Sequence, residues 1–482
     1  MNSSSGSSPS RAGSGVERMT ALDSSFLYAE TPRTPMHVGS LAIFEGAPFF
    51  DDAGVFRLDA VRERVEERLA RLPRFRKRPK FLPFQFARPV WVDDPDFDIA
   101  NHVKLMVLPA PGSRDELDLV CGQLQMRVLD RSHPLWELWF IGGLDDGNVA
   151  LVEKIHHSMI DGVSGVEVAA ALLDLEPHVA PIDVEPWTPT ATSDLGLLVE
   201  GVCEAISQPV AAARHLGSQL VAPREILALA TGVPDLARSL LGHGRATGLH
   251  HAVGRRRTLR TVSEPLARLK EIGHTFDATI NDVALTAVAG GVLALMAARG
   301  EAVDDALLHV LVPVSMRPAA DQLTLGNQVA AMIVPVPVGE GGVIERLGEV
   351  RNHLRRSKAD HQSVGAEILV DSLDLLPSGV LALTSRAIHH QPLVDIVVTN
   401  IPGPPFPLYF DGAELLESIP IVPLGGNLTL GVAIMSYNGR LTFGVHADGA
   451  GCPDVAVFVE GLRGDLEALL ALSAEDALEG TP

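Results

Sequence analysis

Two apolar runs on either side of a short turn are the feature that most restricts the fold of this chain. Residues 135–144 read LWELWFIGGL and residues 148–157 read NVALVEKIHH, with the turn Asp-Asp-Gly at 145–147. A turn of this composition between two apolar runs predicts neighbouring antiparallel strands. Residues 165–175, GVEVAAALLDL, have the composition of a helix. The pattern therefore predicts a strand pair followed by a helix, with two adjacent histidines where the second strand ends.

Strand and helix patterns recur in both halves of the chain, which predicts an α/β (α+β) protein. Besides the segments above, we expect strands from residue 35 and over 308–314 and 329–338, three more strands between residues 395 and 449, and helices over 55–69, 114–129, 264–272, 280–299, 343–359 and 454–472. Four prolines within 177–192 indicate a linker. The predicted organisation is a disordered Ser/Gly-rich tail over 1–16, an N-terminal domain over 17–176, a Pro-rich and helical linker over 177–250 and a C-terminal domain over 251–482.

The charge balance restricts the partners of the protein. Its 39 Lys and Arg side chains against 60 Asp and Glu give a formal net charge of −21. Such a charge repels a phosphate backbone, so we expect no binding to nucleic acid. The strongest basic cluster is RLPRFRKRPKF at 71–81. It suits either a solvated loop or a patch for an anionic cofactor tail or lipid headgroups.

Membrane-spanning and disulfide-stabilised classes are disfavoured. The apolar run 283–298 is shorter than the roughly 20 residues that a spanning helix needs, which favours a buried helix. The N-terminal residues lack the apolar segment of a secretory signal. Three widely spaced cysteines, Cys121, Cys203 and Cys452, suit a reducing compartment and offer no zinc-binding pair.

The doublet His156-His157 is followed by Asp161 and Gly162. Adjacent side chains of an extended segment point to opposite faces, so the two imidazoles do not readily bind one metal ion. A single imidazole at a strand end suits a general base, because its pKa lies near neutral pH. Asp161 would either pair with an arginine or cap the next helix while the histidines are merely buried. Gly162 permits a positive φ or the close approach of another segment.

No nucleophile accompanies the doublet, because GxSxG is absent and the cysteines lie outside reactive motifs. If His157 is a base, we expect it to act on a substrate hydroxyl, with direct transfer between two bound substrates and no covalent enzyme intermediate. The candidate partners of Asp161 are Arg317, Arg74 and Arg78.

HHSMIDG at 156–162 resembles the HHxxxDG signature of acyl-CoA-dependent acyltransferases related to chloramphenicol acetyltransferase, of peptide-synthetase condensation domains and of polyketide-associated acyltransferases. A narrower resemblance, to the bacterial wax ester synthase/diacylglycerol acyltransferase (WS/DGAT) family, runs in register from about residue 18 to 470. It is carried by LDSSFLYAETPRTPMHVGSLAIFEG (22–46), PLWELWFIGGL (134–144), INDVALTAVAGG (280–291), LVPVSMRP (311–318), GNQVAAMIVPVPV (326–338) and VVTNIPGPP (397–405).

The resemblance implies two chloramphenicol-acetyltransferase-like domains, a connecting helical linker and an active-site tunnel between the domains. It implies a long-chain acyl-CoA as donor and co-substrate, no cofactor and no metal, and diacylglycerol or a long-chain alcohol as acceptor. His157 matches the catalytic base of the family and His156 the partner histidine, while Asp161 matches the aspartate that holds the loop and Gly162 gives it room. The implied location is the cytoplasm, with peripheral association to the inner membrane face or to lipid droplets.

Five further residues are candidates for shaping the site or binding substrate. Asn281 and Asp282 stand at the start of the apolar helix predicted over 280–299. They either cap that helix or place a donor where negative charge develops during acyl transfer. Pro134, Leu135 and Trp136 stand at the start of the strand expected beside the one that carries the doublet. Trp136 suits core packing, a wall of the acyl tunnel, or both.

Two other functions stay open at this stage. A polyketide-associated or condensation-type acyltransferase would share the fold and use another alcohol acceptor, and a docking surface for a carrier domain would distinguish it. A catalytically weak protein that binds lipid bodies would also keep the fold, although the intact HHxxxDG pattern argues against that class. The acceptor preference, the acyl chain length and the oligomeric state do not follow from the sequence.

Overall fold

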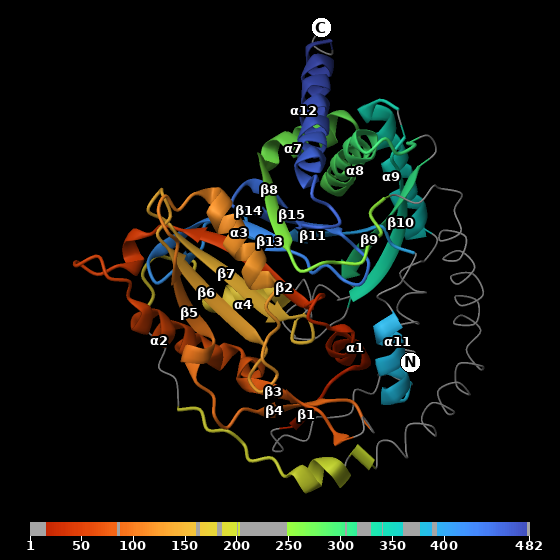
Figure 1. The fold of residues 1–482 in the computed structure, drawn as a ribbon. Coiled ribbons are helices and arrows are strands. Elements are labelled where there is room, and N and C mark those ends of the chain that lie inside the picture. Colours follow the sequence, from red (N-terminus) through yellow and green to blue (C-terminus); the bar gives the residue numbers. More distant parts are fainter. Residues whose placement is uncertain are drawn as a thin grey trace, which may run out of the picture.

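The described part of the chain builds two six-stranded sheets with helices packed against them, and one three-stranded sheet (Figure 1). The computed structural model describes residues 16–83, 87–160, 164–180, 186–199, 201–202, 248–303, 306–315, 329–339, 341–359, 376–387 and 393–479. The helices are α1 (Ala21–Ala29), α2 (Leu58–Arg68), α3 (Arg114–Gln125), α4 (Ser164–Leu172), α7 (Leu266–Thr275), α8 (Ile280–Ala298), α9 (Val343–Ala359), α11 (Ser378–Ala387) and α12 (Val455–Glu479). The strands are β1 (Val16–Arg18), β2 (His37–Phe44), β3 (Lys77–Lys80), β4 (Val90–Asp93), β5 (Val103–Val107), β6 (Trp136–Gly142), β7 (Val149–His156), β8 (Arg257–Pro265), β9 (Leu307–Ser315), β10 (Val329–Pro337), β11 (Ile396–Pro402), β12 (Tyr409–Phe410), β13 (Ala413–Ile421), β14 (Leu430–Tyr437) and β15 (Arg440–Asp448).

The first six-stranded sheet has the strand order β12-β13-β2-β7-β6-β5. β6 and β7 pair antiparallel on either side of the turn at 145–147, which confirms the predicted strand pair. β7 also pairs antiparallel with β2, and His156 lies opposite His37. On β7, Leu151 belongs to an apolar cluster on one face of the sheet and Val152 to a cluster on the other. Because both faces are buried, these strands are almost continuously apolar instead of alternating.

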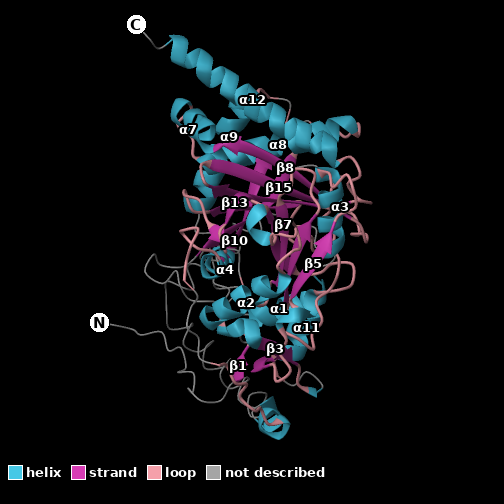
Figure 2. Cartoon of the chain, turned by 90° about the vertical axis from the view of Figure 1, so that its left-hand side faces the viewer, coloured by secondary structure: helices cyan, strands magenta, loops and turns pink. Residues whose placement is uncertain are grey.

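The second six-stranded sheet has the order β10-β9-β11-β14-β15-β8, and α8 lies in its core. α12 and α9 pack on α8, and Figure 2 shows these helices with α7 as a layer on one side of the strands. Among the described residues, α8 is the one helix long and apolar enough to cross a membrane. Its most apolar window is 72% buried inside the protein. α8 is therefore the core helix that the sequence predicts.

Elements from the C-terminal half of the chain also complete the N-terminal half. β13 pairs antiparallel with β2, and β12 extends the same sheet. α11 packs on α1, where Leu381 and Tyr28 share one apolar cluster. Strand pairing and helix packing thus join the two halves. The domain ranges 17–176 and 251–482 stay predictions.

Candidate active site

Backbone hydrogen bonds from two neighbouring segments hold the histidine doublet at the end of β7. The amide of His156 donates to the carbonyl of Leu135, at 2.9 Å. The amide of His157 donates to the carbonyl of Met36, at 2.8 Å. Met36 precedes β2 and Leu135 precedes β6, so the doublet is positioned by the two strands that flank β7.

The two imidazoles have different surroundings. His156 is fully buried, and its Nδ1 accepts a hydrogen bond from the amide of Ser158 at 3.1 Å and lies 2.7 Å from the Ser158 hydroxyl. Because Nδ1 accepts this hydrogen bond, Nε2 is the ring nitrogen that can carry a proton toward Glu30. His157 is partly exposed and stacks on Phe26 of α1, with ring centroids 4.0 Å apart and planes within 14°. His156 is therefore fixed inside the protein, whereas His157 is the accessible member of the pair.

A buried carboxylate, Glu30, collects the polar groups behind the doublet. Its Oε1 lies 3.5 Å from Nε2 of His156 and 3.4 Å from Nε2 of His37, and it accepts a hydrogen bond from the amide of Met36 at 3.2 Å. Its Oε2 accepts a hydrogen bond from Arg131 at 3.0 Å. The Glu30 side chain is only 2% exposed. One carboxylate thus connects the start of β2, the doublet and the segment before β6.

Glu30 is ionised in the folded protein. Burial by itself would raise the pKa of this carboxyl, but the contacts with His156 and His37 outweigh burial and lower the pKa well below its usual range. Burial lowers the pKa of His37 to about 4, so His37 is uncharged at neutral pH. Arg131 is then the permanent cation that balances the carboxylate. The site holds a buried negative charge behind the ring of His156.

The predicted loop residues Asp161 and Gly162 lie outside the described residues, as does Arg317, one candidate partner of Asp161. The other two candidates have acidic partners of their own. Arg74 pairs with Glu17 and also donates to the carbonyl of Met159 at 3.3 Å. Arg78 lies 3.8 Å from Asp94. The predicted role of Asp161 in holding the loop stays a prediction.

Trp136 lies in the core of the first half of the chain. Its indole donates a hydrogen bond to the carbonyl of Phe75 at 2.8 Å and stacks on His102, with centroids 4.4 Å apart. Leu135 is also fully buried, and its carbonyl holds the backbone of His156. The packing of Trp136 therefore fixes this segment, and the carbonyl of Leu135 within it fixes the backbone of His156.

Asp282 caps helix α8, whereas Asn281 contacts a strand of the second sheet. Thr279 is the N-cap of α8, and its side chain accepts from the amide of Asp282 while the Asp282 carboxylate accepts from the amide of Thr279. Asp282 therefore belongs to a capping box, which is the capping role expected of this segment. The Asn281 carbonyl oxygen accepts from Nδ2 of Asn400 on β11, at 3.4 Å. Asn281 thus joins the start of α8 to the second sheet.

Glu30 and Arg131 are among the site residues that sequence reasoning missed. They are 101 positions apart, so no local pattern joins them. The one available signal was the position of Glu30 within the family-like segment 22–46, shortly before the strand that begins at His37. Within the part of the chain that the structure describes, no group of three or more His, Cys, Asp or Glu side chains is arranged to hold a metal ion.

Models of two protein domains match this chain. The wax ester synthase/diacylglycerol acyltransferase catalytic domain matches residues 19–284, and the WS/DGAT C-terminal domain matches residues 325–470. The chain is 31% identical over 465 residues to the "Probable diacyglycerol O-acyltransferase tgs1" of Mycobacterium tuberculosis, an alignment that covers 95% of this chain and 96% of that protein.

Solved structures share the fold. The wax ester synthase/diacylglycerol acyltransferase from Marinobacter aquaeolei is 22% identical with a TM-score of 0.64, and the match covers 95% of this chain and 100% of that chain. The starter condensation domain of rhizomide synthetase RzmA is 14% identical with a TM-score of 0.56, covering 95% of each chain. These matches confirm the expected mixed α/β fold with two sheet-rich, chloramphenicol-acetyltransferase-like halves. The chain belongs to the wax ester synthase/diacylglycerol acyltransferase family and is an acyltransferase.

Proposed function

We propose that this acyltransferase moves a long-chain acyl group from acyl-CoA to diacylglycerol, to a long-chain alcohol, or to both. The observation that carries the proposal is the unequal pair of histidines. His156 is locked by Ser158 and faces the buried carboxylate of Glu30. His157 follows at the strand end, partly exposed and held flat against Phe26. A fixed backbone with one accessible imidazole suits a general base better than a metal ligand pair.

In the proposed reaction, His157 takes the proton of the acceptor hydroxyl as the oxygen attacks the thioester carbonyl. The carbon–sulfur bond then breaks, the ester is released, and the leaving sulfur of coenzyme A takes the proton from His157. No covalent acyl-enzyme forms. In support, burial raises the pKa of both described cysteines, Cys121 and Cys452, and that of Cys452 reaches about 11. A thiol with such a pKa holds little thiolate at neutral pH and is a poor nucleophile.

We further propose that the protein works in the cytoplasm at the surface of a membrane or lipid droplet, where an acylglycerol acceptor and its product partition. Large exposed apolar side chains support this placement: Leu195 is 70% exposed, Val199 55% and, on α11, Leu383 70%. Such side chains suit contact with lipid. Flotation of cell lysate through a sucrose gradient tests the placement. Recovery of all the protein in the soluble fractions during lipid accumulation would contradict it.

The enzymatic proposal is tested by the release of free coenzyme A from palmitoyl-CoA, with diacylglycerol or hexadecanol as acceptor. His157→Ala should lower turnover by roughly 100-fold or more while the fold is retained. His251→Ala is the matched control, because this exposed histidine also belongs to a doublet. It should keep full turnover. Absence of free coenzyme A above background with both acceptors would refute the donor and acceptor assignment. Full turnover of His157→Ala would refute the role of His157.

A further inference from the structure

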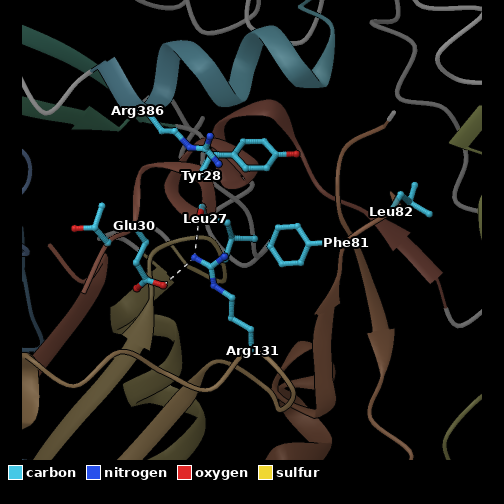
Figure 3. A pocket seen from close by; sticks show the side chains of 8 residues that line it. Leu27, Tyr28, Glu30, Phe81, Leu82, Arg131 and Arg386 are labelled. Atoms are coloured by element: carbon cyan, nitrogen blue, oxygen red, sulfur yellow. Dashed lines mark hydrogen bonds and ion pairs between the residues drawn. The ribbon is translucent and has the colours of Figure 1, made fainter. Parts of the chain in front are cut away.

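A cavity of about 550 Å³ lies where α1, α11 and the segment after β3 meet. Its wall combines two arginines and a carboxylate with apolar and aromatic side chains: Leu27, Tyr28, Glu30, Phe81, Arg131 and Arg386. Figure 3 shows Arg131 and Arg386 extending into the cavity from opposite sides, with Glu30 beside Arg131. The volume lies within the range of small-molecule sites.

The charges on this wall do not balance. Arg131 is neutralised by Glu30, at 3.0 Å, and also donates to the carbonyl of Leu27 at 2.8 Å. Arg386 is exposed, and it forms no ion pair or hydrogen bond with any other described residue. The cavity therefore carries one guanidinium charge more than it has carboxylates. An anionic ligand would supply the missing charge, and a guanidinium binds phosphate oxygens in a bidentate geometry.

The basic side chains of the nearby cluster RLPRFRKRPKF do not line this cavity, and three of them pair with acidic residues elsewhere. Arg74 and Lys77 both pair with Glu17. Lys80 pairs with Asp194. Of this cluster, it is the aromatic Phe81 that reaches the cavity wall. The arginine without an acidic partner on this wall comes from α11, more than 300 positions further along the chain.

The cavity is connected with the candidate active site through α1 and the residue that follows it. Phe26 stacks on His157, and the next residue, Leu27, lines the cavity. Glu30 lies on the cavity wall and faces His156 as well. A ligand bound in this cavity would therefore contact the same helix that positions the proposed base.

We propose that this cavity binds the phosphate-bearing part of coenzyme A, with Arg386 as its anion-binding side chain and the rings of Tyr28 and Phe81 as surfaces for the apolar and planar parts of the ligand. The proposal rests on acyl-CoA being the donor, as proposed above. It makes Arg386 a determinant of donor affinity that takes no part in the transfer itself.

The experiment compares two donors on the full-length protein: palmitoyl-CoA, and S-palmitoyl-N-acetylcysteamine, which lacks the phosphates and the nucleotide. Arg386→Ala and Arg386→Glu should raise KM for palmitoyl-CoA by roughly tenfold or more, since a charge-assisted contact is lost. KM for the truncated donor should change by less than a factor of two. Arg463→Ala on α12, another exposed arginine, is the control and should leave both KM values unchanged.

Three results with the Arg386 variants would overturn the proposal. The first is an unchanged KM for palmitoyl-CoA, and the second is an equal rise of KM for both donors. The third is a loss of binding to phosphatidylglycerol vesicles with unchanged donor kinetics, which would identify the ligand as a membrane phosphate. If the wild-type protein releases no free thiol from either donor, coenzyme A from the one and N-acetylcysteamine from the other, the proposed function fails. Calorimetry with coenzyme A then decides separately about the cavity. Binding to the wild type that is lost in Arg386→Glu supports the cavity site, and absence of binding to the wild type refutes it.

Discussion

Glu30→Gln is the substitution that tests the arrangement of the site most directly. The change keeps the size of the side chain and removes its charge. The carboxylate uses Oε1 for the amide of Met36 and for two imidazoles, and Oε2 for Arg131. A glutamine has one acceptor oxygen only, so its amide nitrogen must face either Arg131 or the Met36 amide, which are both donors.

The expected loss follows from this geometry. A hydrogen bond to a charged group contributes about 1.5–3 kcal/mol, and breaking a fully buried ion pair costs about 3–5 kcal/mol. Because the Arg131 side chain is 35% exposed and water can solvate it in part, the lower part of these ranges applies. We expect Glu30→Gln to lower the free energy of unfolding by about 2–3 kcal/mol. Turnover should fall roughly tenfold or more, since the imidazole of His156 loses its carboxylate and the doublet loses its fixed position.

Urea denaturation monitored by circular dichroism gives the stability difference between variants, and coenzyme A release below the melting range gives turnover. Glu67→Gln is the matched control, because Glu67 forms a partly exposed pair with Arg64 one helical turn away. Such a pair contributes under about 1 kcal/mol, so this variant should resemble the wild type. If Glu30→Gln is as stable and as active as Glu67→Gln, the carboxylate does not organise the site and the reasoning is wrong.

Two further predictions concern the core and the pH dependence of stability. Trp136→Ala should lower the free energy of unfolding by about 3–5 kcal/mol, as expected for a buried indole, whereas Trp136→Phe should lose about 1–2 kcal/mol because the carbonyl of Phe75 loses its donor. Equal losses in the two variants, measured by urea denaturation, would show that packing of the aromatic ring does not contribute to stability. Burial raises the pKa of Glu153 from 4.5 to about 7, and the hydroxyl of Ser40 offsets only part of this effect. Between these pH values the folded protein holds a proton that the unfolded chain has released, so the contribution of Glu153 is largest below pH 4.5 and is lost as pH rises through 7. That contribution amounts to roughly 3 kcal/mol. Glu153→Gln should therefore flatten the fall in the urea midpoint over this range, and parallel curves for the wild type and the variant would contradict the assignment.

The local patterns of the chain predict most of its elements. The strand pair β6 and β7, the buried helix α8 and the position of the doublet at the end of β7 follow from apolar periodicity and from turn residues, which act over a few positions. Some elements and element ends were not predicted. The helix expected over 264–272 begins at Leu266, because the segment before it is the edge strand β8, whose alternating pattern was not recognised.

Long-range pairing was not predictable in the same way. β13 joins the first sheet through β2, although 371 positions separate the paired residues Phe44 and Leu415. The short apolar pattern of β13 fits either sheet, and its partner depends on the edge that the rest of the fold leaves free. The contact between α11 and α1, which creates the cavity with Arg386 in its wall, has the same origin.

The sequence alone determined the two halves, the family and the histidine pair, since a doublet at a strand end followed by Asp and Gly can be read within seven residues. The tertiary structure decided which imidazole is buried and which is accessible, and it alone placed Glu30 between His156 and Arg131. The physical reason is that a buried charge is stable only when partners from distant segments meet it in one place. Such a meeting is a property of the folded chain and leaves no periodic trace in the sequence.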